Sequence, residues 1–169
     1  LLVDFLFGDV GFHAQQAPQP AMPVIQRLGP RRYPAPLAVP PPHPGKNAYI
    51  RICAGCHMVD GRGLPNLFPP LTDSPTVQAA DPTALILIAL HGLEGPVEVN
   101  GQFFDGVMPA QGNFLSDREL AAVVSYIRQE WGHGADVVAP TQVQALRAGH
   151  PRHDPWTMEE LSRLISSAP

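Results

Sequence analysis

The sequence predicts an all-α protein whose helices are joined by long loops. Two amphipathic segments begin with capping residues, a third segment is bounded by proline and glycine, and no apolar and polar residues alternate over a useful length. The 169 residues are 44% hydrophobic and 15% charged, which suits one globular domain of ordinary size with extensions. We therefore expect a soluble, helical protein.

Proline dominates the beginning of the chain. Ten of the 21 prolines lie between residues 18 and 44, in stretches such as YPAPLAVPPPHP. Proline lacks an amide donor and restricts the residue before it, so this region cannot sustain a helix or a central strand. We expect residues 1–44 to form an extended arm, which is either a linker from a larger architecture or a segment that lies in a groove on a partner protein.

Charge and hydropathy exclude two classes of partner. The net charge is −4 and Lys and Arg number only 11, so the chain offers no basic stripe and we expect no nucleic-acid partner. The apolar start, LLVDFLF, is far shorter than the roughly 20 residues of a membrane span. Because the chain begins with Leu and lacks a positively charged leading region, we expect membrane association only indirectly or through a removed N-terminal segment.

The compact part begins at Gly45 with a short helix. This segment, GKNAYIRICAGCHMVDGRG, follows a proline and is broken at Gly61 and Gly63. The next stretch, LPNLFPPLTDSP at residues 64–75, is rich in proline and predicts an irregular loop.

Three further helices follow. In ADPTALILIALHG, Asp81 is a suitable N-cap, the following proline fits the first helical position, and Gly92 fits the C-terminal stop. Ser116 and Glu119 form a capping box ahead of an apolar stripe that ends at Gly132. Of the predicted helices, this one has the strongest sequence evidence. A second capping box, TMEE at residues 157–160, predicts a short terminal helix after a mostly irregular tail.

These elements divide the chain into three parts. We expect the arm at residues 1–44, a helical domain at residues 45–132, and a C-terminal extension with one short helix at residues 133–169.

The only two cysteines lie in one motif, CAGCH. Cys53, Cys56 and His57 stand at positions i, i+3 and i+4, which places their side chains on one side of a helix. C-x-x-C-H is the attachment signature of c-type haem, in which both thiols bind the porphyrin and the imidazole reaches the iron. A structural zinc site would need further ligands, and a thioredoxin-like pair would need a βαβ context, neither of which the sequence offers.

A second axial ligand provides an independent test of this interpretation. Met58 follows the histidine on the same short helix and cannot cross the porphyrin plane, while Met22 and Met158 lie outside the compact region. Met108, in the loop sequence FDGVMPAQG, remains the candidate, although a methionine there could also simply fill a gap in the core. His91 is the alternative distal ligand, or it caps the C-terminus of its helix.

At these residues the chain resembles the class I c-type cytochromes with one haem. The resemblance covers roughly residues 45–132 and includes FPPL, VMPA and the final helix LSDRELAAVVSYIRQEW. It implies the small cytochrome c fold, in which three to five helices surround one covalently bound haem, here with a long proline-rich arm and a short helical tail. It also implies that the first and last helices cross at Gly45, Tyr49 and Tyr126.

The resemblance also implies a wall beside the proximal histidine. Pro69, Pro70 and Leu71 would form this wall, in which a proline carbonyl accepts the imidazole N–H. No residue is expected to be catalytic. The predicted cofactor-binding residues are Cys53, Cys56, His57, Met108, Pro70 and Leu71, with His57 and Met108 as the iron ligands.

The final haem domain of cytochrome subunits in membrane-associated alcohol, sugar and aldehyde dehydrogenase complexes is similar to the run from ALILIALHG onward. The chain departs from those subunits by having one C-x-x-C-H motif instead of three. We predict a one-electron carrier and not an enzyme, with a haem enzyme or gas sensor as the alternative. The expected partners are a donor dehydrogenase or respiratory complex and a downstream cytochrome or oxidase, in the periplasm or an equivalent compartment.

Overall fold

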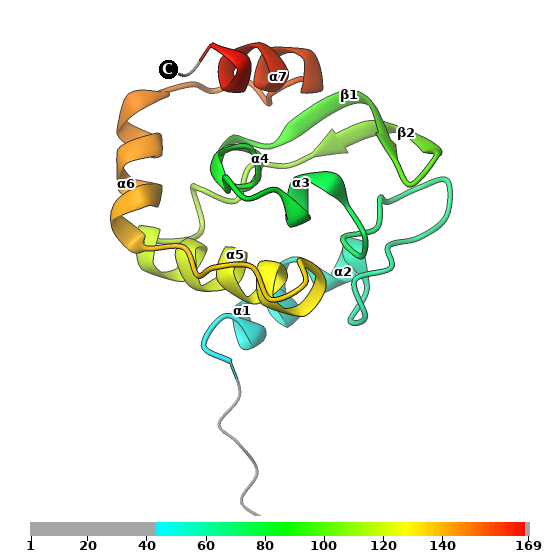
Figure 1. The fold of residues 1–169 in the computed structure, drawn as a ribbon, viewed down its shortest axis with the longest axis horizontal. Coiled ribbons are helices and arrows are strands. Elements are labelled where there is room, and N and C mark those ends of the chain that lie inside the picture. The colour runs from blue at the N-terminus through cyan, green and yellow to red at the C-terminus, as the bar shows by residue number, and fades with distance from the viewer. Residues whose placement is uncertain (1–42, 168–169) are drawn as a thin grey trace, which may run out of the picture. The chain divides into compact units, whose positions relative to one another are not determined.

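A computed structural model describes residues 43–167, so the predicted arm up to residue 42, with Met22, lies outside the described residues. The described part contains helices and one two-stranded sheet, which lies between the fourth and fifth helices in the sequence (Figure 1). The elements are α1 (Lys46–Ile52), α2 (Ala54–His57), α3 (Pro75–Gln78), α4 (Thr83–His91), β1 (Leu93–Val99), β2 (Gln102–Met108), α5 (Asp117–Trp131), α6 (Pro140–Gly149) and α7 (Met158–Ser166). None of the helices in this part is long and apolar enough to cross a membrane.

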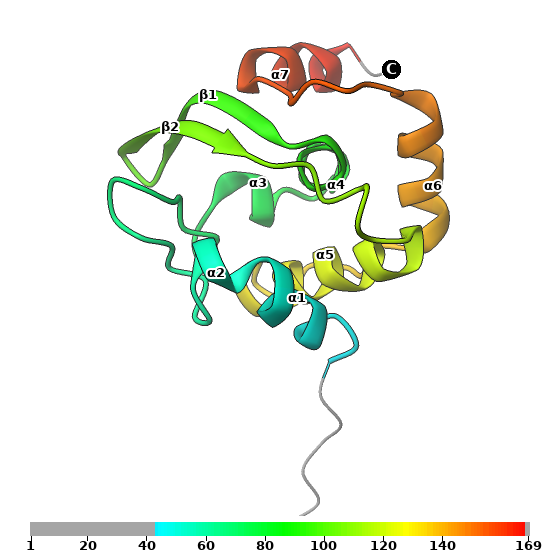
Figure 2. The same ribbon diagram turned by 180° about the vertical axis from the view of Figure 1, so that it is seen from behind.

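The first helix crosses α5, as the family resemblance implies (Figure 2). A Cβ atom on Gly45 would meet the backbone carbonyl of Ala122, so only glycine permits this close approach. The rings of Tyr49 and Tyr126 lie 5.4 Å apart across the same contact. The predicted single helix is divided in two, because α1 ends at Ile52 and α2 begins at Ala54, with Cys53 as the cap residue between them.

The predicted helices α4 and α5 are present. In α5 the capping box is confirmed, since Ser116 accepts from the Glu119 N–H and the Glu119 carboxylate accepts from the Ser116 N–H at 3.0 Å. In α4 the N-cap is Pro82 and not Asp81 as predicted. The Asp81 carboxylate accepts from both the N–H and the hydroxyl of Thr83, and this local turn places the first helical residue at Thr83.

A β-hairpin follows α4 and corrects the prediction of an all-α chain with no strands. Strands β1 and β2 pair antiparallel, with Leu93 opposite Met108 at the open end. The two-residue turn is Asn100–Gly101, with φ angles of 54° and 75°, which suits a tight hairpin. Gly95 and Gly106 face each other and Pro96 stands opposite Asp105, so the apolar alternation is too weak to predict a strand.

The C-terminal extension holds two helices where the sequence predicted one. Helix α6, which was expected to be irregular, buries Val143 completely and packs against α4 and α5. Helix α7 begins with the predicted capping box of Thr157 and Glu160 and packs against β1 and α4. The backbone between these helices joins the hairpin, because Glu94 N–H donates to the Trp156 carbonyl at 2.8 Å. The extension therefore lies beside the hairpin and the end of α4.

Candidate functional site

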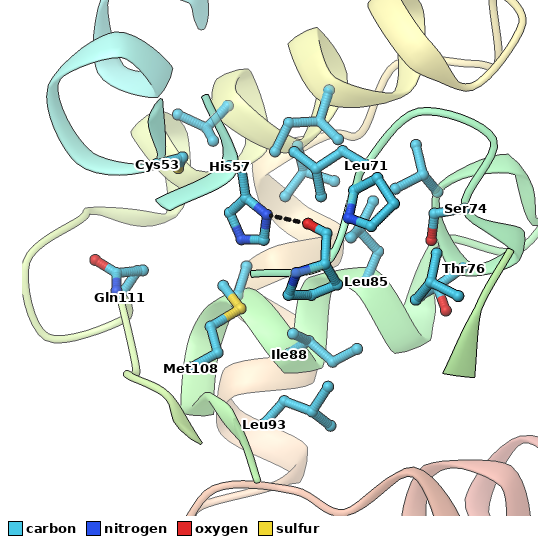
Figure 3. A pocket seen from close by; sticks show the side chains of 18 of the residues that line it. Cys53, His57, Leu71, Ser74, Thr76, Leu85, Ile88, Leu93, Met108 and Gln111 are labelled. Carbon is cyan, nitrogen blue, oxygen red and sulfur yellow. Dashed lines mark hydrogen bonds between the residues drawn. The ribbon is translucent and has the colours of Figure 1, made fainter. Parts of the chain in front are cut away.

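An apolar crevice lies between α2, the loop before α3, helices α4 and α5, and the hairpin (Figure 3). It consists of two adjoining pockets, one reached by Cys53 and the other by Cys56. Both pockets share the residues His57, Pro69, Leu93, Val97 and Met108. The pocket reached by Cys53 is called the deeper pocket because its lining includes the buried aliphatic residues Leu85, Ile88, Leu120, Val123, Val124 and Ile127.

His57 is buried and held in one orientation. Its Nδ1 lies 2.9 Å from the Pro69 carbonyl oxygen, and because a carbonyl only accepts, Nδ1 carries the hydrogen. Burial lowers the pKa of His57, while the hydrogen bond to Pro69 acts in the opposite direction. The crevice therefore contains a neutral imidazole whose Nε2 lone pair is free for a ligand bond.

Met108, at the end of β2, points toward the ring of His57 across the crevice (Figure 3). Its backbone carbonyl passes so close to Gly92 that a Cβ there would meet it. Two backbone bonds anchor the following loop to the end of α4, from Gln111 N–H to the Ala89 carbonyl and from Gly112 N–H to the Leu90 carbonyl, both 3.0 Å. Local packing thus directs the thioether toward the imidazole.

The two thiols stand at the edge of the crevice. Cys53 is half-buried and Cys56 is exposed, and they form no disulfide. Burial, with a smaller contribution from Cys56, raises the pKa of Cys53 to about 11. A redox-active cysteine pair needs a lowered thiol pKa, so this environment argues against a thioredoxin-like role. Within residues 43–167 no group of three or more His, Cys, Asp or Glu side chains is arranged to hold a metal ion.

The structure places the remaining predicted residues with one correction. Pro70 and Leu71 line the deeper pocket, and Pro69 is the proline whose carbonyl accepts from His57. Met58 is held outside the crevice by its carbonyl, which accepts from the Tyr49 hydroxyl at 2.6 Å. Met158 was expected to lie outside the compact region, but it lines the deeper pocket because α7 packs against β1.

Sequence reasoning missed the crevice residues that the hairpin supplies. Leu93, Val97 and Val99 line the deeper pocket, and Phe104 lines the neighbouring one. The Asn100–Gly101 pair, a strong hairpin signal, was the feature of the sequence that could have revealed them.

His91 lies at the end of α4 and is not among the residues that line the crevice. It is half-buried, and its Nε2 finds no hydrogen-bond partner among the described residues. Burial lowers the pKa of His91, and the electrostatic effect of Arg152, Arg147 and His150 lowers it further. This environment favours a neutral histidine that packs against the C-terminal extension.

We expect acidification from about pH 7.5 to about pH 5.5 to destabilise the protein through His91. The unfolded chain binds a proton near pH 6.5 while the folded chain keeps His91 neutral, so stability falls as the pH drops through that value. In the variant His91→Gln, the melting temperature followed by circular dichroism should fall less over the same range. A decline as steep as that of the unsubstituted protein would refute this assignment.

Comparison with protein families matches residues 43–131 to the family Cytochrome c. The alcohol dehydrogenase (quinone) cytochrome c subunit of Gluconobacter oxydans (strain 621H) is 40% identical over 105 residues, 61% of this chain and 22% of that subunit. Cytochrome c-552 of Thermus thermophilus is 36% identical over 115 residues, 66% of this chain and 77% of that protein. The gluconate 2-dehydrogenase cytochrome c subunit of Pantoea cypripedii is 40% identical over 105 residues, 61% of this chain and 24% of that subunit.

The fold and the crevice define a small haem protein of the c type, since two thiols stand at the edge of an apolar crevice that contains a neutral imidazole and a thioether. The chain belongs to the cytochrome c family. The matched domain carries covalent haem c through Cys53 and Cys56 and is an electron-transfer domain of this family. The chain spans less than a quarter of the length of the dehydrogenase subunits named above, 22% and 24%.

Proposed function

We propose that the protein relays single electrons through a haem held between His57 and Met108, as the carrier of a periplasmic dehydrogenase or respiratory complex. One observation carries the ligand assignment: the free imidazole nitrogen and the thioether lie in the same apolar crevice and point toward one another. The bound haem supplies iron that alternates between the ferrous and ferric states.

The residues of the crevice have distinct tasks in this proposal. The Pro69 carbonyl fixes the tautomer and the orientation of His57, as hydrogen-bonded partners do for ligating histidines in general. The aliphatic lining excludes water, which disfavours the extra positive charge of the oxidised state, and a methionine ligand favours the reduced state. We therefore expect a positive reduction potential.

Two ligands from the protein also explain why a carrier is favoured over an enzyme or gas sensor. His57 and Met108 would together hold the iron, and no coordination position would then remain for oxygen or another small molecule. The loop of Met108 is fixed by backbone bonds to α4, which suits a ligand that stays in place. An enzyme or gas sensor would need this position to open.

The names of the relatives support a dehydrogenase as the electron donor. They include cytochrome subunits of a quinone-dependent alcohol dehydrogenase, a gluconate 2-dehydrogenase and a fructose dehydrogenase. A downstream cytochrome or oxidase would accept the electron. Covalent haem attachment in bacteria takes place outside the cytoplasm, as the family resemblance implies, which supports a periplasmic location with membrane association through the partner.

Reduction of the ferric protein by substrate-fed membranes tests the partner assignment. Excess purified ferric protein is mixed with washed membranes of the source organism, and ethanol, gluconate or fructose is added in turn. We expect one substrate to reduce the haem much faster than the membranes do without substrate. The visible spectrum of the haem follows the reduction. If none does so while a chemical one-electron reductant reduces the protein completely, the carrier role stands and the dehydrogenase partner is wrong.

A further inference from the structure

We propose that Arg147 in α6 is a positioning residue for Met108, so that the C-terminal extension controls how firmly the thioether is held in the crevice. The inference rests on the proposed role of Met108 as an iron ligand. It assigns a function to a helix that lies outside the part of the chain matched by the Cytochrome c family.

Arg147 binds three acceptors in the segment that follows the Met108 loop. Its Nη1 donates to the Gly112 carbonyl at 2.7 Å, and its Nη2 donates to the Leu115 carbonyl at 3.1 Å. Its Nε donates to the Asp117 carboxylate at 2.7 Å. A guanidinium offers its donors in a rigid plane, so one side chain can hold three separate acceptors in a way that lysine cannot.

This ion pair is more sheltered than an ordinary surface pair. The side chains of Arg147 and Asp117 are 34% and 29% exposed, whereas those of Arg163 and Glu159 in α7, which form an exposed ion pair, are 70% and 80% exposed. Exposed pairs contribute little to stability because water and salt screen them. The contacts of Arg147 are therefore expected to hold their partners more firmly.

The Gly112 peptide forms a hydrogen bond through its N–H and another through its carbonyl. Its N–H donates to the Leu90 carbonyl at 3.0 Å, and its carbonyl accepts from Arg147. A Cβ on Gly112 would lie 2.6 Å from the Leu90 carbonyl oxygen and 3.0 Å from Arg147 Nη1, so the peptide fills the space between them. The Gly112 peptide is therefore held between the end of α4 and Arg147.

Only three residues separate Gly112 from Met108, and they are stiff. Pro109 follows the methionine directly, and its carbonyl accepts from the Gln111 side chain at 2.8 Å. A displacement of Gly112 is therefore transmitted to Met108 instead of being absorbed in a flexible loop. Loss of Arg147 would leave Gly112 held by α4 alone and let the thioether leave the crevice more often.

Binding of imidazole to the ferric holoprotein measures how easily Met108 is displaced. We expect Arg147→Ala to bind imidazole about tenfold more tightly than the unsubstituted protein, the change expected when about 1.4 kcal/mol of support for the loop is lost. Arg147→Lys should lie between the two. Arg163→Ala, which removes the exposed ion pair of α7, should bind imidazole like the unsubstituted protein.

The titration is carried out well below the melting temperature, so that a purely structural role of Arg147 would leave the affinity unchanged. The complete burial of Val143 keeps α6 attached in these variants, and Arg147→Lys replaces Arg147→Ala if the latter does not fold. Unchanged imidazole affinity in the Arg147 variants would overturn the proposal. If Met108→Ala also binds imidazole with the affinity of the unsubstituted protein, Met108 is not the displaced ligand and the proposed function itself fails.

Discussion

Replacement of both Cys53 and Cys56 by alanine is expected to prevent residues 45–132 from folding stably. Without the thioether bonds the haem is no longer fixed, and the aliphatic side chains of α4 and α5 that line the crevice would face water. A domain of this size buries too little surface to compensate for an empty centre. Far-ultraviolet circular dichroism of the purified variant should show that most helical signal is lost, and acid extraction should leave no haem on the chain.

The single variant Cys56→Ala provides the matched control. Cys56 is exposed while Cys53 is half-buried, so this variant keeps the more enclosed thioether and should retain haem with reduced stability. If the double variant melts at the same temperature as the unsubstituted protein, the haem is not part of the core and our interpretation of the crevice is wrong.

Met108→Ala is expected to preserve the covalent haem but change its chemistry. The reduction potential should fall by on the order of a few hundred millivolts, within the range of about 0.8 V that axial ligands span. The ferrous variant should also bind carbon monoxide, because one coordination position becomes free. Potentiometric titration and the carbon monoxide difference spectrum measure the two effects.

Met158→Ala is the matched control for this substitution. Met158 lines the same deeper pocket, but only Met108 also borders the second pocket together with His57. Removing Met158 should therefore leave the potential nearly unchanged and give no carbon monoxide complex. A larger effect from Met158→Ala than from Met108→Ala would assign the ligand to α7 instead of β2.

The sequence allowed prediction of those parts of the fold that local residues determine. The capping boxes at Ser116 and Thr157 and the stop at Gly92 mark helices because the side chain or the backbone freedom of one residue fixes the helix end. The C-x-x-C-H motif is equally local. Its three groups reach one crevice because they lie within five consecutive residues.

The features that were missed depend on contacts between distant segments. The hairpin has two glycines and a proline where strands usually carry branched residues, so its pairing and its packing on the crevice hold it together. Helix α6 has no side-chain N-cap and is stabilised by docking on α4 and α5. Met158 reaches the crevice only because the extension returns to the hairpin, a path that no single segment of the sequence specifies.

The weak ferric sulfur-to-iron charge-transfer band tests our central claim most directly, because it arises only when a methionine sulfur binds the iron. We predict this band in the unsubstituted protein and in Met158→Ala, and its absence in Met108→Ala. A band that persists in Met108→Ala, or that is missing from the unsubstituted protein, would contradict ligation by Met108. In the second case an open iron position becomes the better assignment, because His91 is not among the residues that line the crevice, and an open position would favour the haem enzyme or gas sensor.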